Sequence, residues 1–261
     1  MDTSLGQRVS ALLTARNIGR PLHYAHTVTS TNTLAMEAAQ LDAPHGTVFL
    51  ADYQTDGRGR RGRIWRAARG QNLTFSVILR LPISGAIIGM VPLAACLGVS
   101  EAIAKVVSPS KPQLKWPNDI LLEGRKICGM LLQSFGAPMA PMVLGIGLNV
   151  NQTTFPPELS YYATSLFLST GRPVDRASMM AEVLVHLEKS FELLSTNPAL
   201  VRKRYTENLI GVGKSCRITR VNEELVGTLI GIEESGALIL ETSKGLRTIY
   251  AGDVSLYMAD H

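Results

Sequence analysis

The densest chemistry in this sequence lies between Gly57 and Gly70, a run of 14 residues with six arginines, four glycines, one tryptophan and no acidic residue. Glycine lets the backbone curl so that its N–H groups approach a ligand, and each guanidinium offers a planar set of donors that matches phosphate or carboxylate oxygens. Trp65 adds a flat face on which a base can stack. The run therefore predicts an anion-binding loop. The alternative is a solvated charge run, but such runs rarely interleave glycines with a tryptophan.

The positive charge of the chain belongs to this loop. The 261 residues hold 26 Lys and Arg against 21 Asp and Glu, a net charge of +5, and without the six loop arginines the balance is 20 against 21, or −1. A general nucleic-acid or membrane binder spreads its cations over a face, because it must neutralise several phosphates in a row. We therefore expect one small anion held at one point, with no DNA and no membrane as partners.

Composition favours a soluble, cytoplasmic enzyme. The three cysteines have no metal-type spacing and are odd in number, which fits a reducing cytosol. The N-terminus lacks the pattern of a secretory signal. The uncharged stretch 81–100 is long enough to span a membrane, but its prolines and glycines indicate a buried core helix that begins after Pro82 or Ser84.

The loop hangs between two predicted strands, 46–53 and 73–81. Before them, Ser30 and its neighbours offer N-cap side chains to an Ala- and Leu-rich helix that ends near Leu41. The other predicted elements are a short helix at 4–16, strands at 113–116, 120–122, 126–134 and 142–150, and a long amphipathic helix around 180–194. These predict an α+β (mixed α/β) domain over residues 1–210, with a central mixed β-sheet packed with helices.

From about Gly211 the pattern changes to short β-rich runs separated by turn clusters. The four runs are 216–221, 225–232, 237–241 and 246–250. They predict a small SH3-like β-barrel over residues 211–261, appended to the first domain.

Two motifs suggest other chemistry, but the residues around them do not fit it. Residues 208–215 end in the Gly-Lys-Ser of a P-loop, but Asn208 stands in place of the first glycine, and the segment follows a predicted helix and opens a strand. His23 and His26 have the spacing of a metal pair, yet no third ligand follows. No Gly-x-Ser-x-Gly elbow or Cys/His nucleophile arrangement occurs.

Several segments together resemble the biotin protein ligases, the enzymes that attach biotin to carboxylases. They are Ser30-Thr31-Asn32, Asp52-Tyr53-Gln54 leading into 57–65, Lys115-Trp116-Pro117-Asn118-Asp119, 125–131, and 145–150. Order and spacing match the family from about residue 22 to the C-terminus, and Cys128 stands where the family usually has an alanine. Only about thirty residues precede Ser30, so the resemblance implies the ligase-only form without an N-terminal DNA-binding domain.

This resemblance implies a two-step reaction. Biotin's carboxylate attacks the α-phosphate of ATP, bound with Mg²⁺, to give biotinyl-5′-adenylate and pyrophosphate. The biotinyl group then passes to a lysine of the biotin carboxyl carrier domain of acetyl-CoA carboxylase or a related carboxylase. Two anions repel unless cations lie between them, and the glycine-arginine loop can supply those cations.

The same resemblance assigns residues to roles. The catalytic residues it implies are Arg58, Arg60 and Lys126. The biotin-binding residues are Ser30, Thr31, Asn32, Gln54, Arg58, Gly59, Arg60 and Lys126. The ATP-binding residues are Arg60, Arg63, Trp65, Asn118, Lys126 and Asn149, with Asp119 as a candidate for holding magnesium or the acceptor lysine.

Other readings of these residues stay open at this point. Ser30 to Asn32 also fits a simple helix cap, Trp116 fits core packing, and Lys126 fits an ordinary edge-strand lysine. For the whole chain, a lipoate-type ligase would share the fold and the adenylation chemistry, although the arginine-rich loop favours biotin. A nucleic-acid-binding module would use the loop for phosphates and Trp65 for a base. A homodimer is a further expectation.

Overall fold

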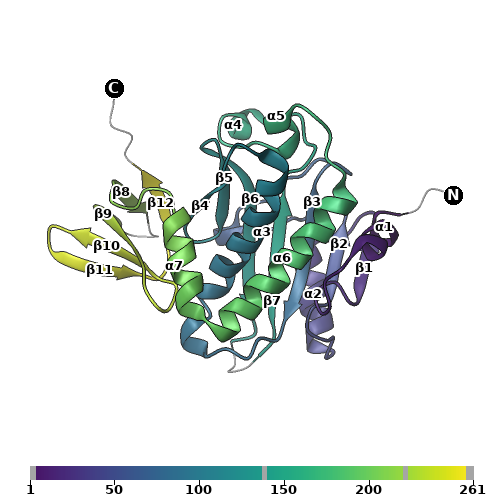
Figure 1. Ribbon diagram of the computed structural model, residues 1–261, viewed down its shortest axis with the longest axis horizontal. Helices are drawn as coiled ribbons and strands as arrows, with labels where there is room; N and C mark the ends of the chain where they lie inside the picture. The colour runs from purple at the N-terminus through teal and green to yellow at the C-terminus, as the bar shows by residue number, and fades with distance from the viewer. Residues whose placement is uncertain (1–3, 137–139, 220–222, 257–261) are drawn as a thin grey trace.

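The computed structural model describes residues 4–136, 140–219 and 223–256, which form two sheets with helices around the larger one (Figure 1). The helices are α1 (Leu5–Leu12), α2 (Thr31–Gln40), α3 (Met90–Val107), α4 (Pro157–Ser160), α5 (Leu166–Thr170), α6 (Arg176–Thr196) and α7 (Pro198–Asn208), with 3₁₀ turns η1 (Arg60–Gly62) and η2 (Gly85–Ile87). The strands are β1 (Leu22–Ala25), β2 (Val48–Ala51), β3 (Leu73–Leu79), β4 (Gln113–Lys115), β5 (Asp119–Leu122), β6 (Arg125–Ser134), β7 (Met142–Leu148), β8 (Ser215–Thr219), β9 (Glu224–Ile232), β10 (Leu238–Thr242), β11 (Gly245–Ile249) and β12 (Asp253–Leu256).

The larger sheet has seven strands in the order β1-β2-β3-β7-β6-β5-β4. Only β1 and β2 run parallel and the other neighbours are antiparallel, so the predicted mixed sheet is confirmed. The two strands predicted around the arginine loop are β2 and β3, which pair with each other. The sequence did not predict β1, an edge strand of only four residues, none of which is fully buried.

The two faces of this sheet are covered unequally. On one face α3 packs against β4, β5 and β6, and α6 packs against α3 (Figure 1). The apolar residues of β3 are fully buried. On the other face α2 contacts β2, β3 and β7, where Ala35 and Ala39 meet Ile78 and Val143.

The uncharged stretch at 81–100 is mainly α3, a buried core helix as predicted. Its start is later than expected, because the chain first makes η2, whose N–H at Ala86 is capped by the Ser84 hydroxyl. Pro92 lies in the first turn of α3, where a missing N–H breaks no intrahelical bond. By length and composition α3 would be able to cross a membrane, but most of it is buried inside the protein.

The C-terminal strands form a five-stranded antiparallel sheet in the order β11-β10-β9-β8-β12. The four predicted runs are β8 to β11, and β12 was not predicted. The pairings among the described residues leave β11 and β12 as edges, so they do not close the expected barrel. The division of the chain at residue 210 stays a prediction.

Trp116 ties this small sheet to the larger one. Its indole is 2% exposed and its Nε1 donates to the Gly236 carbonyl at 3.0 Å, so its interpretation as a core residue is confirmed. A Cβ on Gly236, which has φ +89°, would lie 2.6 Å from the carbonyl carbon of Gly89. This close approach at the start of α3 fixes the β9–β10 turn against the larger sheet and its helices.

The two misleading motifs have structural roles. The 208–215 segment runs from the end of α7 through a turn into β8, so the expected helix-to-strand context is confirmed and the geometry of a P-loop is not present there. His23 stacks on Phe49 with ring centroids 4.9 Å apart, whereas His26 contacts Tyr24 and Asp52.

Candidate active site

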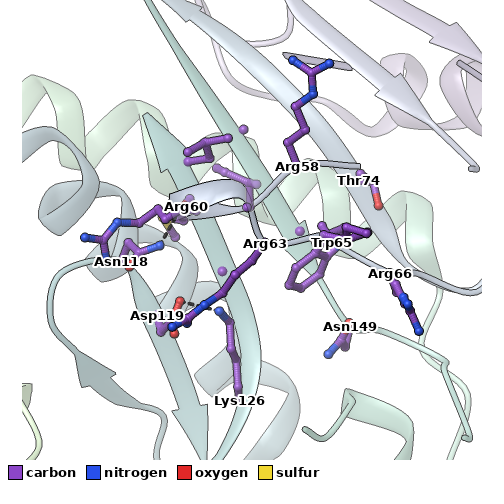
Figure 2. A pocket seen from close by; sticks show the side chains of 18 of the residues that line it. Arg58, Arg60, Arg63, Trp65, Arg66, Thr74, Asn118, Asp119, Lys126 and Asn149 are labelled. Atoms are coloured by element: carbon purple, nitrogen blue, oxygen red, sulfur yellow. Dashed lines mark hydrogen bonds and ion pairs between the residues drawn. The ribbon is translucent and has the colours of Figure 1, made fainter. Parts of the chain in front are cut away.

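A cavity of about 440 Å³ lies over β3, β6 and β7, and all the predicted site residues line it (Figure 2). These residues are Ser30, Thr31, Asn32, Gln54, Arg58, Gly59, Arg60, Arg63, Trp65, Asn118, Asp119, Lys126 and Asn149. They come from five separate segments of the chain, so the fold brings together what the sequence could only relate by motif.

Glycines on β7 make the floor of this cavity. A Cβ on Gly147 would lie 2.2 Å from the Trp65 ring, and one on Gly145 would lie 2.1 Å from Oδ1 of Asn32. Any larger residue would displace these side chains, because real Cβ atoms do not approach so closely. The two glycines on β7 therefore each make room for one predicted site residue.

The polar end of the cavity is built by the start of α2. Thr31 donates from its N–H and its hydroxyl to Oε1 of Gln54, at 2.7 and 2.9 Å. The Ser76 hydroxyl, from β3, donates to Asn32 Oδ1. Ser30 occupies the N-cap position of α2 but its side chain makes no capping bond, so capping alone does not account for this triplet. Except for the partly exposed Gln54, these groups are buried, and their mutual bonds fix their orientation.

The arginine loop is a short hairpin. The Gly59 N–H donates to the Arg63 carbonyl at 2.7 Å, the Trp65 N–H donates to the Gly57 carbonyl at 2.9 Å, and η1 forms the tip. Figure 2 shows Arg58 extending away from the Arg60 and Arg63 side chains. Arg58 lines the cavity, but its guanidinium is paired with Asp56 at 2.8 Å.

Asp253, at the start of β12, holds three of the loop arginines. Its carboxylate lies 2.6 Å from Arg63, 3.4 Å from Arg61 and 3.7 Å from Arg60. Burial lowers the pKa of the Arg60 guanidinium, and the Asp253 charge opposes that change. The loop is therefore held toward the C-terminal sheet by an anionic side chain, which sequence reasoning missed because the contact joins residues 190 positions apart.

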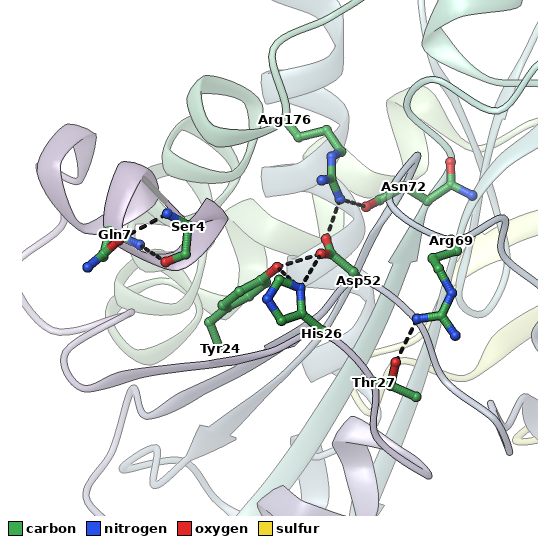
Figure 3. A network of polar contacts seen from close by, with 9 residues as sticks. All are labelled: Ser4, Gln7, Tyr24, His26, Thr27, Asp52, Arg69, Asn72 and Arg176. Atoms are coloured by element: carbon green, nitrogen blue, oxygen red, sulfur yellow. Dashed lines mark hydrogen bonds and ion pairs between the residues drawn. The ribbon is translucent and has the colours of Figure 1, made fainter. Parts of the chain in front are cut away.

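Polar contacts also tie the base of the loop (Figure 3). The Asp52 carboxylate accepts from the Tyr24 hydroxyl and from Arg176 at 2.8 Å, and the Asp52 carbonyl accepts from the Gly70 N–H at 3.1 Å. Burial raises the pKa of Asp52, but the bonds from Tyr24 and Arg176 outweigh it and hold that pKa below its usual range. Desolvation and the same carboxylate raise the pKa of Tyr24 to about 12. This network brings the two ends of the loop together.

Lys126 and Asp119 form an ion pair in the cavity. Lys126 Nζ lies 2.6 Å from Asp119 Oδ1, and both side chains are at most about a third exposed. A Cβ on Gly129, the register partner of Asp119 on β6, would lie 2.8 Å from Lys126 Nζ, so this glycine also makes room for a site residue. Because β6 lies between β7 and β5, the alternative of an edge-strand lysine is wrong.

Two buried polar atoms in the cavity have no partner within the described chain. Asn149 donates its Nδ2 to the Thr164 carbonyl at 3.0 Å, and its Oδ1 is left unpaired. Trp65 Nε1 is also buried and unpaired. Buried polar groups are nearly always hydrogen-bonded, so these atoms are suited to meet a bound molecule. Asn118 differs, because it donates to the Met130 carbonyl and accepts from Arg60 at 3.0 Å.

Besides Asp253, several residues at the cavity had no predicted role. They include Lys115, Thr74, Leu159, Tyr162 and Arg66, which forms a 3.1 Å ion pair with Glu158. Lys115 and Arg66 lie within motifs that the sequence had marked. The others come from strands and turns whose sequence carries no signal of a site, and only the tertiary structure brings them to the cavity.

Comparisons with known proteins agree with this geometry. The family described as "Biotin/lipoate A/B protein ligase family" matches residues 24–151, and "Biotin protein ligase C terminal domain" matches residues 211–257. The bifunctional ligase/repressor BirA of Bacillus spizizenii is 35% identical over 244 residues, which are 92% of this chain and 75% of that protein. The biotin–[acetyl-CoA-carboxylase] ligase of Mycobacterium tuberculosis is 34% identical over 87% of this chain and 84% of its own length. The structure of the Aquifex aeolicus biotin protein ligase with biotin and ATP matches with a TM-score of 0.78 at 28% identity, over 91% of this chain and 99% of that one.

Proposed function

This chain belongs to the biotin/lipoate A/B protein ligase family, and from that premise we propose how its residues make and transfer the biotinyl group. It is a biotin protein ligase, an ATP-dependent, AMP-forming enzyme with biotinyl-5′-adenylate as its intermediate. The relatives named as biotin ligases favour this function over a lipoate-type ligase or a nucleic-acid-binding module. The acceptor in our proposal is a lysine of a biotin carboxyl carrier domain, as in acetyl-CoA carboxylase.

The observation that carries the assignment of residues is the contrast between the two ends of one cavity. One end is neutral, buried and polar, and the other carries the arginine loop and Lys126. Biotin has the same division, with a neutral ureido ring at one end and a carboxylate at the other. We assign the ring to the polar groups of 30–32 and Gln54, and the carboxylate to the amides and guanidinium groups of 58–60.

The nucleotide then occupies the side of the cavity beneath the loop. Trp65 offers its ring to the adenine, and the unpaired Oδ1 of Asn149 is an acceptor for the adenine amino group. Arg60 and Arg63 can leave Asp253 to bind phosphate oxygens. Asn118 orients Arg60 by accepting its N–H, and Lys126 lies where carboxylate and α-phosphate must meet.

These positions allow both steps of the reaction. In the first, a biotin carboxylate oxygen attacks the α-phosphorus, the new P–O bond forms, and the bond to the β-phosphate breaks to release pyrophosphate. In the second, the neutral amine of the acceptor lysine attacks the biotinyl carbonyl, loses a proton and displaces AMP. Lys126 and the loop cations stabilise the negative charge that develops in both steps.

Magnesium is expected with ATP, but the described residues contain no cluster of three or more acidic, histidine or cysteine side chains that could hold a metal. The cavity has two carboxylates, and each is already paired, Asp119 with Lys126 and Asp253 with arginines. The residues present therefore do not make a metal site of their own. We propose that magnesium arrives on the nucleotide and that Asp119 instead orients Lys126 and receives the acceptor lysine.

Pyrophosphate release tests the proposal. The purified chain with ATP and Mg²⁺ is given biotin, lipoate or octanoate in turn, and we expect release with biotin alone. Equal release with lipoate or octanoate would disprove the substrate assignment. The cytoplasmic location and the homodimer remain predictions, which fractionation of cells and sedimentation of the purified chain would check.

A further inference from the structure

A chain of hydrogen bonds runs from the polar end of the cavity to Gln133 on β6. Asn32 Nδ2 donates to Oε1 of Gln133 at 2.7 Å, and the Leu131 carbonyl lies further from the same nitrogen, at 3.5 Å. The Ser76 hydroxyl donates to Asn32 Oδ1, and its oxygen lies 2.8 Å from Thr31 Oγ1. Ser76 is fully buried, Gln133 is partly exposed, and both lie outside the lining of the cavity. They can therefore act on a bound molecule only through Thr31 and Asn32.

The direction of each bond in this chain follows from the atoms that carry protons. The oxygen of an amide side chain only accepts and its nitrogen only donates, whereas a hydroxyl has one proton to give. Because Nδ2 of Asn32 is directed at Gln133, its Oδ1 faces Ser76, and Ser76 gives its one proton to Asn32. The contact between Ser76 and Thr31 is then a hydrogen bond only if Thr31 is the donor.

The Thr31 hydroxyl has two oxygens to which it can donate. One is Ser76 Oγ at 2.8 Å, and the other is Gln54 Oε1 at 2.9 Å. Gln54 Oε1 already accepts the backbone N–H of Thr31 at 2.7 Å. Donation to Ser76 therefore satisfies every member of the chain. It also leaves Thr31 Oγ1, on a residue that lines the cavity, as an acceptor for a bound molecule.

The opposite direction would need a donor at position 133. Asn32 would then turn its amide by half a turn and donate from Nδ2 to Ser76, and Ser76 would donate to Thr31. Thr31 would in turn present a proton, and no acceptor, to the bound molecule. The Leu131 carbonyl can only accept, so it favours the first direction together with Oε1 of Gln133.

We propose that Gln133 is a positioning residue that makes Thr31 an acceptor for a ring N–H of biotin, an inference that rests on the proposed function. The ureido ring carries two N–H groups, so a neutral pocket that holds it must supply acceptors as well as donors. The Gln133 oxygen sets the amide of Asn32, that amide takes the proton of Ser76, and Ser76 takes the proton of Thr31. Lipoate and octanoate have no N–H group, so either would leave this buried acceptor unpaired and bind more weakly.

Substitutions at position 133 test this direction. For the wild type, Gln133→Glu, Gln133→Met and Gln113→Met, we would measure the Kd for biotin by calorimetry and the KM for ATP in pyrophosphate release. An ionised glutamate only accepts, and methionine keeps the length of the side chain with at most a weak acceptor. Gln113, exposed on β4, is the matched control. Because Gln133 is partly exposed, all these variants should fold, and the KM for ATP reports on the other end of the cavity.

We expect Gln133→Met to raise the Kd for biotin about 5- to 30-fold, because the proton of Thr31 is then no longer directed away from the ligand. Gln133→Glu and Gln113→Met should stay within about 3-fold of the wild type, and the KM for ATP should change little in any variant. An unchanged Kd for Gln133→Met would overturn the proposal. A loss in Gln133→Glu as large as in Gln133→Met would overturn it as well, because glutamate retains the acceptor.

A double-mutant cycle with Ser76→Ala tests whether the effect travels along the chain. Ser76→Ala breaks the chain between Asn32 and Thr31, and should itself raise the Kd for biotin about 10-fold. In that background Gln133→Met should add less than about 3-fold, since the proton of Thr31 no longer depends on position 133. Fully additive losses would mean that Gln133 acts by packing alone, which would overturn the proposal while leaving the ligase function intact. Absence of biotin binding by the wild type would disprove the proposed function itself.

Discussion

The two ends of the cavity are held in opposite ways. At the biotin end, Thr31 and Asn32 are buried, neutral and hydrogen-bonded to the side chains of Gln54, after β2, and Ser76, on β3. At the nucleotide end, five of the six loop arginines are paired with the carboxylates of Asp56, Glu158 and Asp253, and their side chains are between about a quarter and three quarters exposed. Neutral bonds within a packed core have no competitor in solution, whereas ion pairs near the surface exchange readily with other anions. The biotin end is therefore preorganised, and the loop end is adaptable.

Lys126 lies where the two ends of the cavity meet, and we expect its substitution to have the largest effect on activity. Lys126→Ala removes a charge-assisted contact made mainly in the transition state, so the rate of adenylate formation should fall on the order of 10²–10³-fold. Biotin affinity, measured by calorimetry, should change much less, because the polar end is untouched. Lys105→Ala is the matched control. Lys105 lies on α3, and its Nζ also pairs with a carboxylate oxygen, that of Glu182, at 2.6 Å. Near-normal adenylation by Lys126→Ala would reduce this lysine to a structural residue.

Substitution of two glycines on β7 should weaken ligand binding at the biotin end and at the nucleotide end of the cavity separately. Gly145→Ala would displace Asn32 and should weaken biotin binding roughly 10- to 100-fold, because it breaks the buried polar network. Gly147→Ala would displace the Trp65 ring and should weaken ATP binding by a similar factor with less effect on biotin. The affinity of each variant for biotin and for ATP is measured by titration. Equal losses of both ligands in both variants would show that the cavity behaves as one unit.

The sequence motifs predicted the residues of the site better than they predicted the strands and contacts that position those residues. The arginine loop was found because it is a local run whose residue types carry the chemistry, and Lys126 was found because residues 125–131 match a motif of the family. Asp253 and Ser76 were missed because their roles arise from strand pairing and from contacts between distant segments. β1 and β12 were missed because they are edge strands of only four residues each, too short for an alternating pattern to indicate a strand.

The Asp52 network at the base of the arginine loop should affect the free energy of unfolding more than the rate of the reaction. Arg176→Met leaves the Asp52 carboxylate, 14% exposed, without its main cation and should lower the free energy of unfolding by about 1–3 kcal/mol at neutral pH. Arg8→Met is the control, because Arg8 pairs with Asp175 at the surface and should contribute less than about 1 kcal/mol. Urea unfolding of both variants provides the comparison.

The same network sets the direction of a pH effect. The pKa of Asp52 is lower in the folded protein than its ordinary value, so its contribution to stability is fully present above about pH 4 and is lost as pH falls through the folded pKa. The difference between the wild type and Arg176→Met should therefore shrink in acid. A constant difference down to about pH 2 would mean that Asp52 is not the partner that matters.

The smallest expected effect concerns how firmly Asp253 holds the empty loop. Asp253→Asn removes the carboxylate shared by Arg60, Arg61 and Arg63, and the released like charges should repel one another and open the loop more often. Since these groups are partly exposed and screened, trypsin cleavage within the loop should rise only about 2- to 5-fold. Biotin with ATP should restore equal protection in both proteins, because phosphate oxygens then take the place of the carboxylate. Asp56→Asn, which releases only Arg58, should have a smaller effect. If Asp253→Asn leaves cleavage of the empty loop unchanged, the loop end is as preorganised as the biotin end.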